Sequence, residues 1–154
     1  MIKNVNRYDA YAYRIASRPF APLAGNIHEG SWITLNDDGQ IVQSTGAKKS
    51  FLLLTSKRPG RDNVSPQQFP RGSYLLGAFE ITVVNDADAD TAFDSTETYA
   101  AMTPLKVNAD GILTPWVAPT IATGSITAAG DIGVEIAAYA LGAPVDNELR
   151  ICSK

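Results

Sequence analysis

Two stretches of the chain share one pattern of apolar and polar positions. Residues 33–41 alternate apolar residues into Asn36-Asp37-Asp38-Gly39 and then resume as an apolar strand, and residues 105–113 do the same around Asn108-Ala109-Asp110-Gly111. Asp-Gly between alternating apolar runs is a strong hairpin signal, because glycine takes a positive φ without steric cost. The pattern therefore predicts β-hairpins over residues 30–43 and 102–117.

Further strands are predicted by other apolar patterns. The continuous apolar run 51–55 indicates a strand that is buried on both faces, and the alternation within 74–84 indicates another strand. β-Branched residues favour strands over 132–141 and 148–152, with a turn at 142–147 between them. Several short strands separated by turns predict an all-β fold, a single β-barrel or β-sandwich domain of short antiparallel strands.

Three loops are expected between these strands. Residues 57–73 contain three prolines and two glycines, which predicts a long irregular loop. A loop of this length in a compact domain is usually functional or disordered. Residues 86–98 form an acidic loop, and residues 118–130 consist mostly of small residues.

Residues 1–29 have the character of an extended N-terminal arm that precedes a β-rich globular domain over 30–154. Three of the six tyrosines and three arginines lie in the first 18 residues, followed by a segment with Pro19 and Pro22 that disfavours a helix. Tyrosine and arginine are enriched at protein interfaces, so the arm is suited to contact another protein. The equally weighted alternative is an N-terminal strand that covers the chain's own barrel.

Composition narrows the classes of partner. The 154 residues are 45% hydrophobic and 19% charged, with a net charge of −3, so the excess of Lys and Arg that a nucleic-acid binder needs is missing. We therefore expect no direct nucleic-acid partner. We also expect no membrane partner, since no apolar run approaches the length of a membrane span and no signal peptide is visible. A single cysteine, Cys152, is compatible with synthesis in a reducing cytoplasm.

Charge is unevenly distributed along the chain. Residues 48–71 contain six basic side chains and one acidic one, whereas residues 72–110 contain seven acidic side chains and one lysine. Such a separation can orient a protein on a partner or on a second copy. We expect the arm and the 57–73 loop to supply the contacts with a partner protein or subunit, through Arg7, Tyr8, Tyr11, Tyr13, Arg14, Arg18, Phe20, Arg58, Arg61, Phe69 and Arg71.

The acidic loop has a spacing that resembles an EF-hand calcium loop. Acidic side chains fall at positions 1, 3, 5, 9 and 12 of that spacing, which are Asp86, Asp88, Asp90, Asp94 and Glu97. Position 6 is Thr91 where the sharp turn requires glycine, and a strand rather than a helix precedes the loop. A solvated acidic loop is therefore favoured over a calcium site, and no metal ligand is assigned.

Catalysis finds little support in the sequence. His28 is the only histidine, and a lone histidine more often makes a local hydrogen bond than acts as a base. Cys152 lies in a terminal strand and is expected to be a small buried hydrophobe. We therefore expect a protein that is not an enzyme and has no cofactor, with Trp32 and Trp116 as core residues or plugs at the ends of the barrel.

These features together resemble the capsid decoration (cement, or head-stabilising) proteins of tailed bacteriophages. The residues that carry the resemblance are the polar-aromatic arm and three later segments, Gly30–Gly39, Met102–Gly111 and Ala128–Val134. The resemblance implies a β-rich structural virion protein without catalytic residues. It also implies a homo-oligomer, a dimer or trimer, made in the host cytoplasm and seated on the outer surface of the major capsid protein lattice, where it stabilises the expanded head.

Two other classes stay open. A phage tail or baseplate β-module with receptor or glycan binding would expose Trp32 and Trp116. A small β-barrel enzyme would have a deep pocket lined by His28 and acidic groups.

Overall fold

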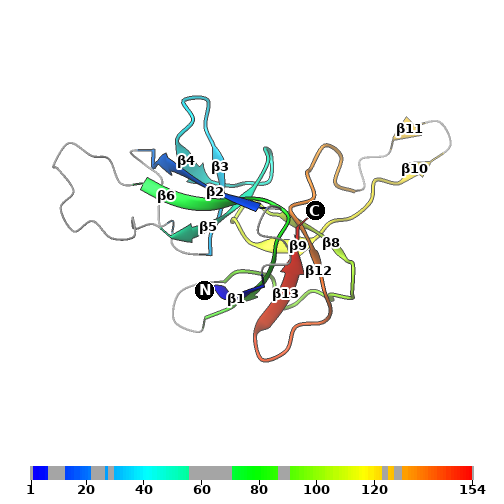
Figure 1. Ribbon diagram of the computed structural model, residues 1–154. Coiled ribbons are helices and arrows are strands. Elements are labelled where there is room, and N and C mark those ends of the chain that lie inside the picture. The colour runs from blue at the N-terminus through cyan, green and yellow to red at the C-terminus, as the bar shows by residue number, and fades with distance from the viewer. Residues whose placement is uncertain are drawn as a thin grey trace, which may run out of the picture.

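The computed structural model describes residues 2–6, 13–21, 27, 30–55, 71–86, 91–122, 125–126 and 130–153, and these residues form strands and no helix (Figure 1). Most strands belong to two antiparallel sheets. The six-stranded sheet runs in the order β1 (Ile2–Asn6), β7 (Glu80–Val84), β13 (Glu148–Cys152), β12 (Ala138–Ala140), β8 (Pro104–Val107), β9 (Leu113–Pro115). The five-stranded sheet runs in the order β2 (Tyr13–Pro19), β6 (Arg71–Gly77), β5 (Phe51–Thr55), β3 (Trp32–Leu35), β4 (Ile41–Gln43).

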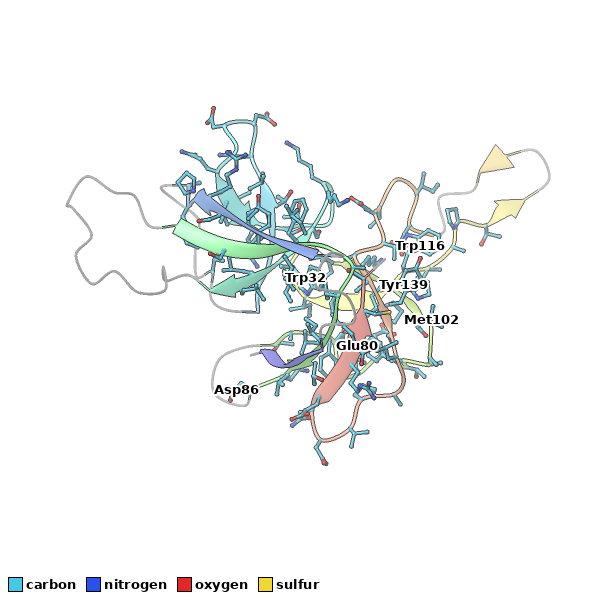
Figure 2. The ribbon with its side chains drawn as sticks, viewed as in Figure 1. Trp32, Glu80, Asp86, Met102, Trp116 and Tyr139 are labelled. Atoms are coloured by element: carbon cyan, nitrogen blue, oxygen red, sulfur yellow. The ribbon has the colours of Figure 1, made fainter. Side chains whose placement is uncertain are left out.

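The all-β fold class predicted from the sequence is confirmed. The two sheets share one buried cluster, to which the five-stranded sheet contributes Trp32, Leu52 and Leu75, and Figure 2 shows Trp32 between them. The six-stranded sheet contributes the alternate residues of its strands, including Ile81, Val83, Leu105, Val107, Leu113, Ala138, Ala140, Leu149 and Ile151. This packing is consistent with a β-sandwich.

The five-stranded sheet is buried on both faces. Its strand β5 places Leu52 in the cluster shared by the two sheets and Leu53 in a second cluster on the opposite face. Tyr74 of β6 lies in that second cluster, and Phe20 packs against it. The continuous apolar run of residues 51–55 therefore predicted the environment of this strand correctly.

Both predicted hairpins are present, and their turns have the same geometry. In the β3–β4 hairpin the amide of Gly39 donates to the Asn36 carbonyl over 2.9 Å, and in the β8–β9 hairpin Gly111 donates to Asn108 over 3.0 Å. The two glycines have φ of 71° and 81°. A three-residue loop of this kind ends in a left-handed residue, which explains why glycine closes both turns.

The described parts of the predicted arm are strands of the chain's own sheets. β1 pairs with β7 at one edge of the six-stranded sheet, and β2 pairs with β6 over its whole length, from Tyr13 opposite Gly77 to Pro19 opposite Arg71. Of the two interpretations of residues 1–29, these stretches follow the one in which N-terminal strands cover the chain itself. The division at residue 29 stays a prediction.

Three predicted boundaries were wrong. Residues 71–73 belong to β6 rather than to the 57–73 loop, because they pair with the end of β2; the rest of that loop lies outside the described residues. The expected strand 74–84 is divided between β6 and β7 at Gly77, whose φ is 91°. Within 132–141 only Ala138–Ala140 is a strand, because residues 132–133 form a turn.

A third, two-stranded sheet lies apart from the other two. β10 (Ile121–Ala122) pairs with β11 (Ser125–Ile126), with Ile121 opposite Ile126. Figure 1 shows this pair projecting away from the body of the molecule, at the upper right.

Candidate interaction surface

The structure places only part of the predicted contact set. Tyr13 and Arg14 lie in β2, opposite Gly77 and Leu76, and Arg71 begins β6. Several predicted residues lie outside the described residues. They are the remaining contact residues Arg7, Tyr8, Tyr11, Arg58, Arg61 and Phe69, together with His28 of the enzyme alternative and the calcium candidates Asp88 and Asp90.

Arg18 is an exposed basic residue near the end of β2, where the chain continues to Phe20 and its parallel bridge to Ile41 of β4. It lies opposite Gly72, and its neighbour Pro19 lies opposite Arg71, so Arg18 and Arg71 occupy adjacent register positions at one end of the β2–β6 pair. An exposed arginine is suited to bind a carboxylate group of a partner.

Phe20 of the predicted contact set also packs within the protein itself. It is half-buried and packs on the second core cluster, and a Cβ built on Gly72 would lie 2.8 Å from the Phe20 ring and from Ile41. The absence of a side chain at Gly72 therefore makes room for the ring. Phe20 contributes to the stability of the five-stranded sheet, and its contribution to partner binding stays a prediction.

The described part of the acidic loop is organised by its own hydrogen bonds. Asp94 Oδ1 accepts from the Thr96 amide (2.9 Å) and from its hydroxyl (2.7 Å), and these two bonds lower the pKa of Asp94. Asp86 and Glu97 are exposed. Among the described residues, no three His, Cys, Asp or Glu side chains are grouped so that they could hold a metal ion.

Asn85 anchors the base of this loop, a role that the sequence did not indicate. Its Oδ1 accepts from the amides of Ala92 (2.7 Å) and Phe93 (3.0 Å), and its Nδ2 donates to the Phe93 carbonyl (2.8 Å). Phe93 also bridges to Leu113 of β9. Asn85 thus ties the end of β7 to a segment that lies beside β9, an edge strand of the same sheet.

The outer face of the six-stranded sheet carries a row of side chains that sequence analysis missed. Since the core residues alternate along each strand, the residues between them face away from the core. Pairing aligns Glu80 with Cys152, Cys152 with Tyr139 and Tyr139 with Pro104, and the Trp116 amide donates to the Pro104 carbonyl over 2.8 Å. These residues come from β7, β13, β12 and β8 and from the position that follows β9. Together they form one row across the sheet, with Glu80 at its acidic end and Trp116 at its aromatic end.

The acidic end of the row is neutralised by an ion pair. Arg150 Nη2 lies 2.5 Å from Glu80 Oε1, and the Glu80 residue is buried. Burial, together with the nearby Glu80 carboxylate, raises the pKa of the Cys152 thiol. A raised pKa keeps the thiol protonated at neutral pH, which disfavours nucleophilic chemistry there.

A cleft opens beside this end of the row. It has a volume of about 650 Å³ and lies between Thr82, Arg150 and the turn that contains Val145 and Asp146. Carboxylates and a guanidinium on its walls can form hydrogen bonds and ion pairs with polar groups of a partner.

The aromatic end of the row is bordered by an exposed apolar residue. Met102 is 62% exposed, and its backbone has a φ of 64°, which is uncommon for a residue other than glycine. The Met102 amide donates to the Ala140 carbonyl over 2.7 Å, which fixes the residue next to β12. Figure 2 shows Trp116, Tyr139 and Met102 following one another along one side of the sheet.

The two tryptophans differ in their surroundings. Trp32 is 1% exposed in the core, as predicted, and its Nε1 has no hydrogen-bond partner among the described residues. Trp116 is partly buried, and its Nε1 donates to the Val134 carbonyl over 3.1 Å. Trp32 therefore cannot serve as a stacking platform for a ligand on the surface.

The row could not have been read from the sequence, because it depends on the register of strands that are far apart along the chain. One signal was available: the alternation within 104–107 and 148–152 separates Pro104, Lys106 and Arg150 from the core residues between them. Which strands lie side by side is not encoded in that alternation.

Comparison with protein-family models, curated proteins and solved structures found no match to this chain. Within the described residues, no helix has the length and hydrophobicity that crossing a membrane requires.

Proposed function

We propose that this chain is a structural virion protein that binds the outer surface of the major capsid protein lattice of a tailed phage and stabilises the expanded head. In this proposal it is a homo-oligomer on the outside of the virion, made in the host cytoplasm, and acts by binding rather than by catalysis. The sequence resemblance to capsid decoration proteins supplies the class of partner.

Met102 is the observation that carries the binding part of the proposal. An exposed methionine in a left-handed conformation costs free energy twice, through backbone strain and through apolar surface left in water. Burial against a partner protein would recover the second cost, and methionine adapts readily to an irregular surface. The half-buried Tyr139 and Trp116 in the same row extend this surface with residue types that are enriched at interfaces.

The rigidity of the body also supports the proposal. A protein that stiffens a shell must transmit force between its contact points, and both sheets here share one close-packed core. Arg18 lies in β2 of the five-stranded sheet, and Met102 lies beside β12 of the six-stranded sheet, so the two residues are at different parts of this body. Binding through both would connect two points of the lattice.

The glycan-binding alternative is less well supported. It requires both tryptophans at the surface, and Trp32 is buried. Trp116 alone would leave a single, partly covered ring as the stacking platform.

The experiment is co-sedimentation of the purified protein with empty expanded heads that lack a decoration protein. We expect saturable binding that is weakened at least tenfold by Met102→Asp and by Arg18→Glu. Ala47→Asp places a new charge at an exposed position of a different segment and should bind like the wild type. Absence of sedimentation with the heads would overturn the proposed function.

Point substitutions are a better test than truncation of the N-terminus. Removal of residues 1–20 would delete β1 and β2, which are edge strands of the two sheets. Loss of binding by the truncated protein could then reflect loss of structure, whereas Arg18→Glu changes one exposed side chain.

A further inference from the structure

The projecting β10–β11 pair, Ile121–Ala122 with Ser125–Ile126, forms a sheet of its own. Figure 1 shows it standing clear of both larger sheets. A two-stranded hairpin is at best marginally stable in water, and three or more strands with a shared face are needed for independent stability. Among the described residues, no further strand pairs with this hairpin to stabilise it.

The base of the hairpin, in contrast, is firmly held. The Asp131 amide donates to the Val117 carbonyl (2.8 Å), and the Val117 amide donates to Asp131 Oδ2 (2.7 Å). Asp131 Oδ1 forms an ion pair with Lys106 of β8, which attaches this base to the six-stranded sheet. The clamp therefore ties Val117 and Asp131, which lie on either side of the hairpin in the chain, to each other and to the six-stranded sheet.

The chemistry of the hairpin is suited to contact with an identical copy. Residues 118–130 contain no charged side chain, in a protein with a net charge of −3. When two identical elements meet about a two-fold axis, residues near that axis approach their own equivalents, so an uncharged segment avoids repulsion between like charges there. Val117 of the clamp and Ile132 next to it are 57% and 51% exposed, so the base of the hairpin carries exposed apolar side chains.

We propose that the β10–β11 hairpin is a self-association element, which pairs edge to edge with the same hairpin of a second copy. Two hairpins would form a four-stranded sheet, and each would supply the other with further strands. The inference rests on the part of the proposed function that makes the protein a homo-oligomer, and it names the surface responsible.

The test measures self-association of the full chain by sedimentation velocity, without capsids. We expect the wild type to associate, and Ile121→Asp and Ile121→Lys each to be monomeric at the same concentration. An equimolar mixture of the two variants should associate again, because repulsion between like charges on the two hairpins is then replaced by attraction between opposite charges. Ala47→Asp is the control, since Ala47 is an exposed residue outside both the hairpin and the cleft, and it should associate like the wild type.

Circular dichroism and thermal unfolding of each variant establish that the body is folded. A monomeric wild type, or association of either Ile121 variant at wild-type strength, would overturn the inference. Failure of the mixture to associate would overturn the pairing of hairpin with hairpin. Capsid binding by a monomeric wild type would leave the capsid-binding part of the proposed function standing while the inference failed, so the two are distinguishable.

Discussion

The side chain of Gln43 donates from Nε2 to the main-chain carbonyl of Asp110 over 2.8 Å. Gln43 is the last residue of β4 in the first hairpin, and Asp110 lies in the turn of the second. The two hairpins, which share one sequence pattern but belong to different sheets, are thus connected directly. A Cβ built on the neighbouring Gly111 would lie 2.4 Å from Gln43 Nε2, so the contact requires glycine at that position.

The matched glycines of the two turns provide the first prediction. Both have a positive φ, so alanine at either position should cost about 1 to 2 kcal/mol in backbone strain. Gly39 has no atom within 4 Å of a built Cβ, whereas alanine at Gly111 must also displace Gln43 from Asp110. We expect Gly111→Ala to lower the free energy of unfolding by about 1 kcal/mol more than Gly39→Ala, measured by urea denaturation.

A Gln43→Ala background is the control for this comparison. Without the Gln43 side chain, Gly39→Ala and Gly111→Ala should lower the free energy of unfolding by the same amount, since only the backbone strain remains. An unchanged difference in that background would show that the contact with Gln43 is not its cause.

The hairpins were predictable because turn chemistry is local. Asn36 to Gly39 and Asn108 to Gly111 carry within four residues the groups that close each turn. The burial of β5 was predictable for a similar reason, because an uninterrupted apolar run has no polar face to offer to water. The break at Gly77 was missed, since the apolar residues on either side continue the same pattern across it.

The second prediction concerns Asn85. Asn85→Ala removes three hydrogen bonds and leaves the amides of Ala92 and Phe93 and the Phe93 carbonyl without this partner. We expect a loss of about 2 to 3 kcal/mol in the free energy of unfolding. Hydrogen exchange should accelerate at the amides of Ala92 and Phe93 beyond the effect on the rest of the sheet.

Asn85→Asp separates the accepting role from the donating role. The aspartate keeps an oxygen for both amides but cannot donate to the Phe93 carbonyl, so its cost should be smaller than that of alanine. Equal exchange rates at residues 92 and 93 in the wild type and Asn85→Ala would refute the anchoring role.

The candidate surface was far less predictable than the fold. Glu80, Cys152 and Tyr139 are neighbours only because β7, β13 and β12 lie side by side in one register. That arrangement depends on which apolar faces pack together across long sequence separations, and single-strand patterns do not contain this information. Sequence reasoning therefore placed the contacts in segments with distinctive composition and missed a surface assembled from single residues of several strands.

The third prediction is a pH dependence at the base of the projecting hairpin. Burial would raise the pKa of Asp131, but hydrogen bonds from Lys106 and the Val117 amide outweigh it and hold the pKa below its usual 3.8. A carboxylate whose pKa is lower in the folded state than in the unfolded state stabilises the fold. This stabilisation is fully present above the unfolded-state pKa and is lost as the pH falls through the folded-state pKa. We expect the free energy of unfolding of the wild type to exceed that of Asp131→Asn by about 1 to 2 kcal/mol at neutral pH. This difference should disappear in strong acid.

The exposed ion pair between Lys48 and Asp37 is the control, measured in the same urea titrations. The side chains of this pair are 58% and 97% exposed, so solvent screens their attraction and Asp37→Asn should leave the stability nearly unchanged at every pH. A gap for Asp131→Asn that persisted unchanged into strong acid would contradict the assignment.

The last prediction concerns Tyr99 under alkaline conditions. Its hydroxyl donates to the carbonyls of Asp94 (2.8 Å) and Leu113 (3.3 Å), and its ring meets Phe93 edge to face. Burial first, and then the carboxylates of Asp94 and Glu97, raise the pKa of Tyr99 well above its usual 10. Because its folded-state pKa is raised, the contribution of Tyr99 to stability is fully present below pH 10. It is lost as the pH rises above that value, where the tyrosine ionises first in the unfolded chain.

Tyr99→Phe should therefore lower the free energy of unfolding by about 1 kcal/mol at neutral pH, because the hydrogen bonds of the hydroxyl are lost. The difference in free energy of unfolding between wild type and variant should shrink as the pH rises above 10. Urea denaturation across this range measures the difference, and a constant gap would show that the Tyr99 hydroxyl ionises as easily in the folded protein as in the unfolded chain.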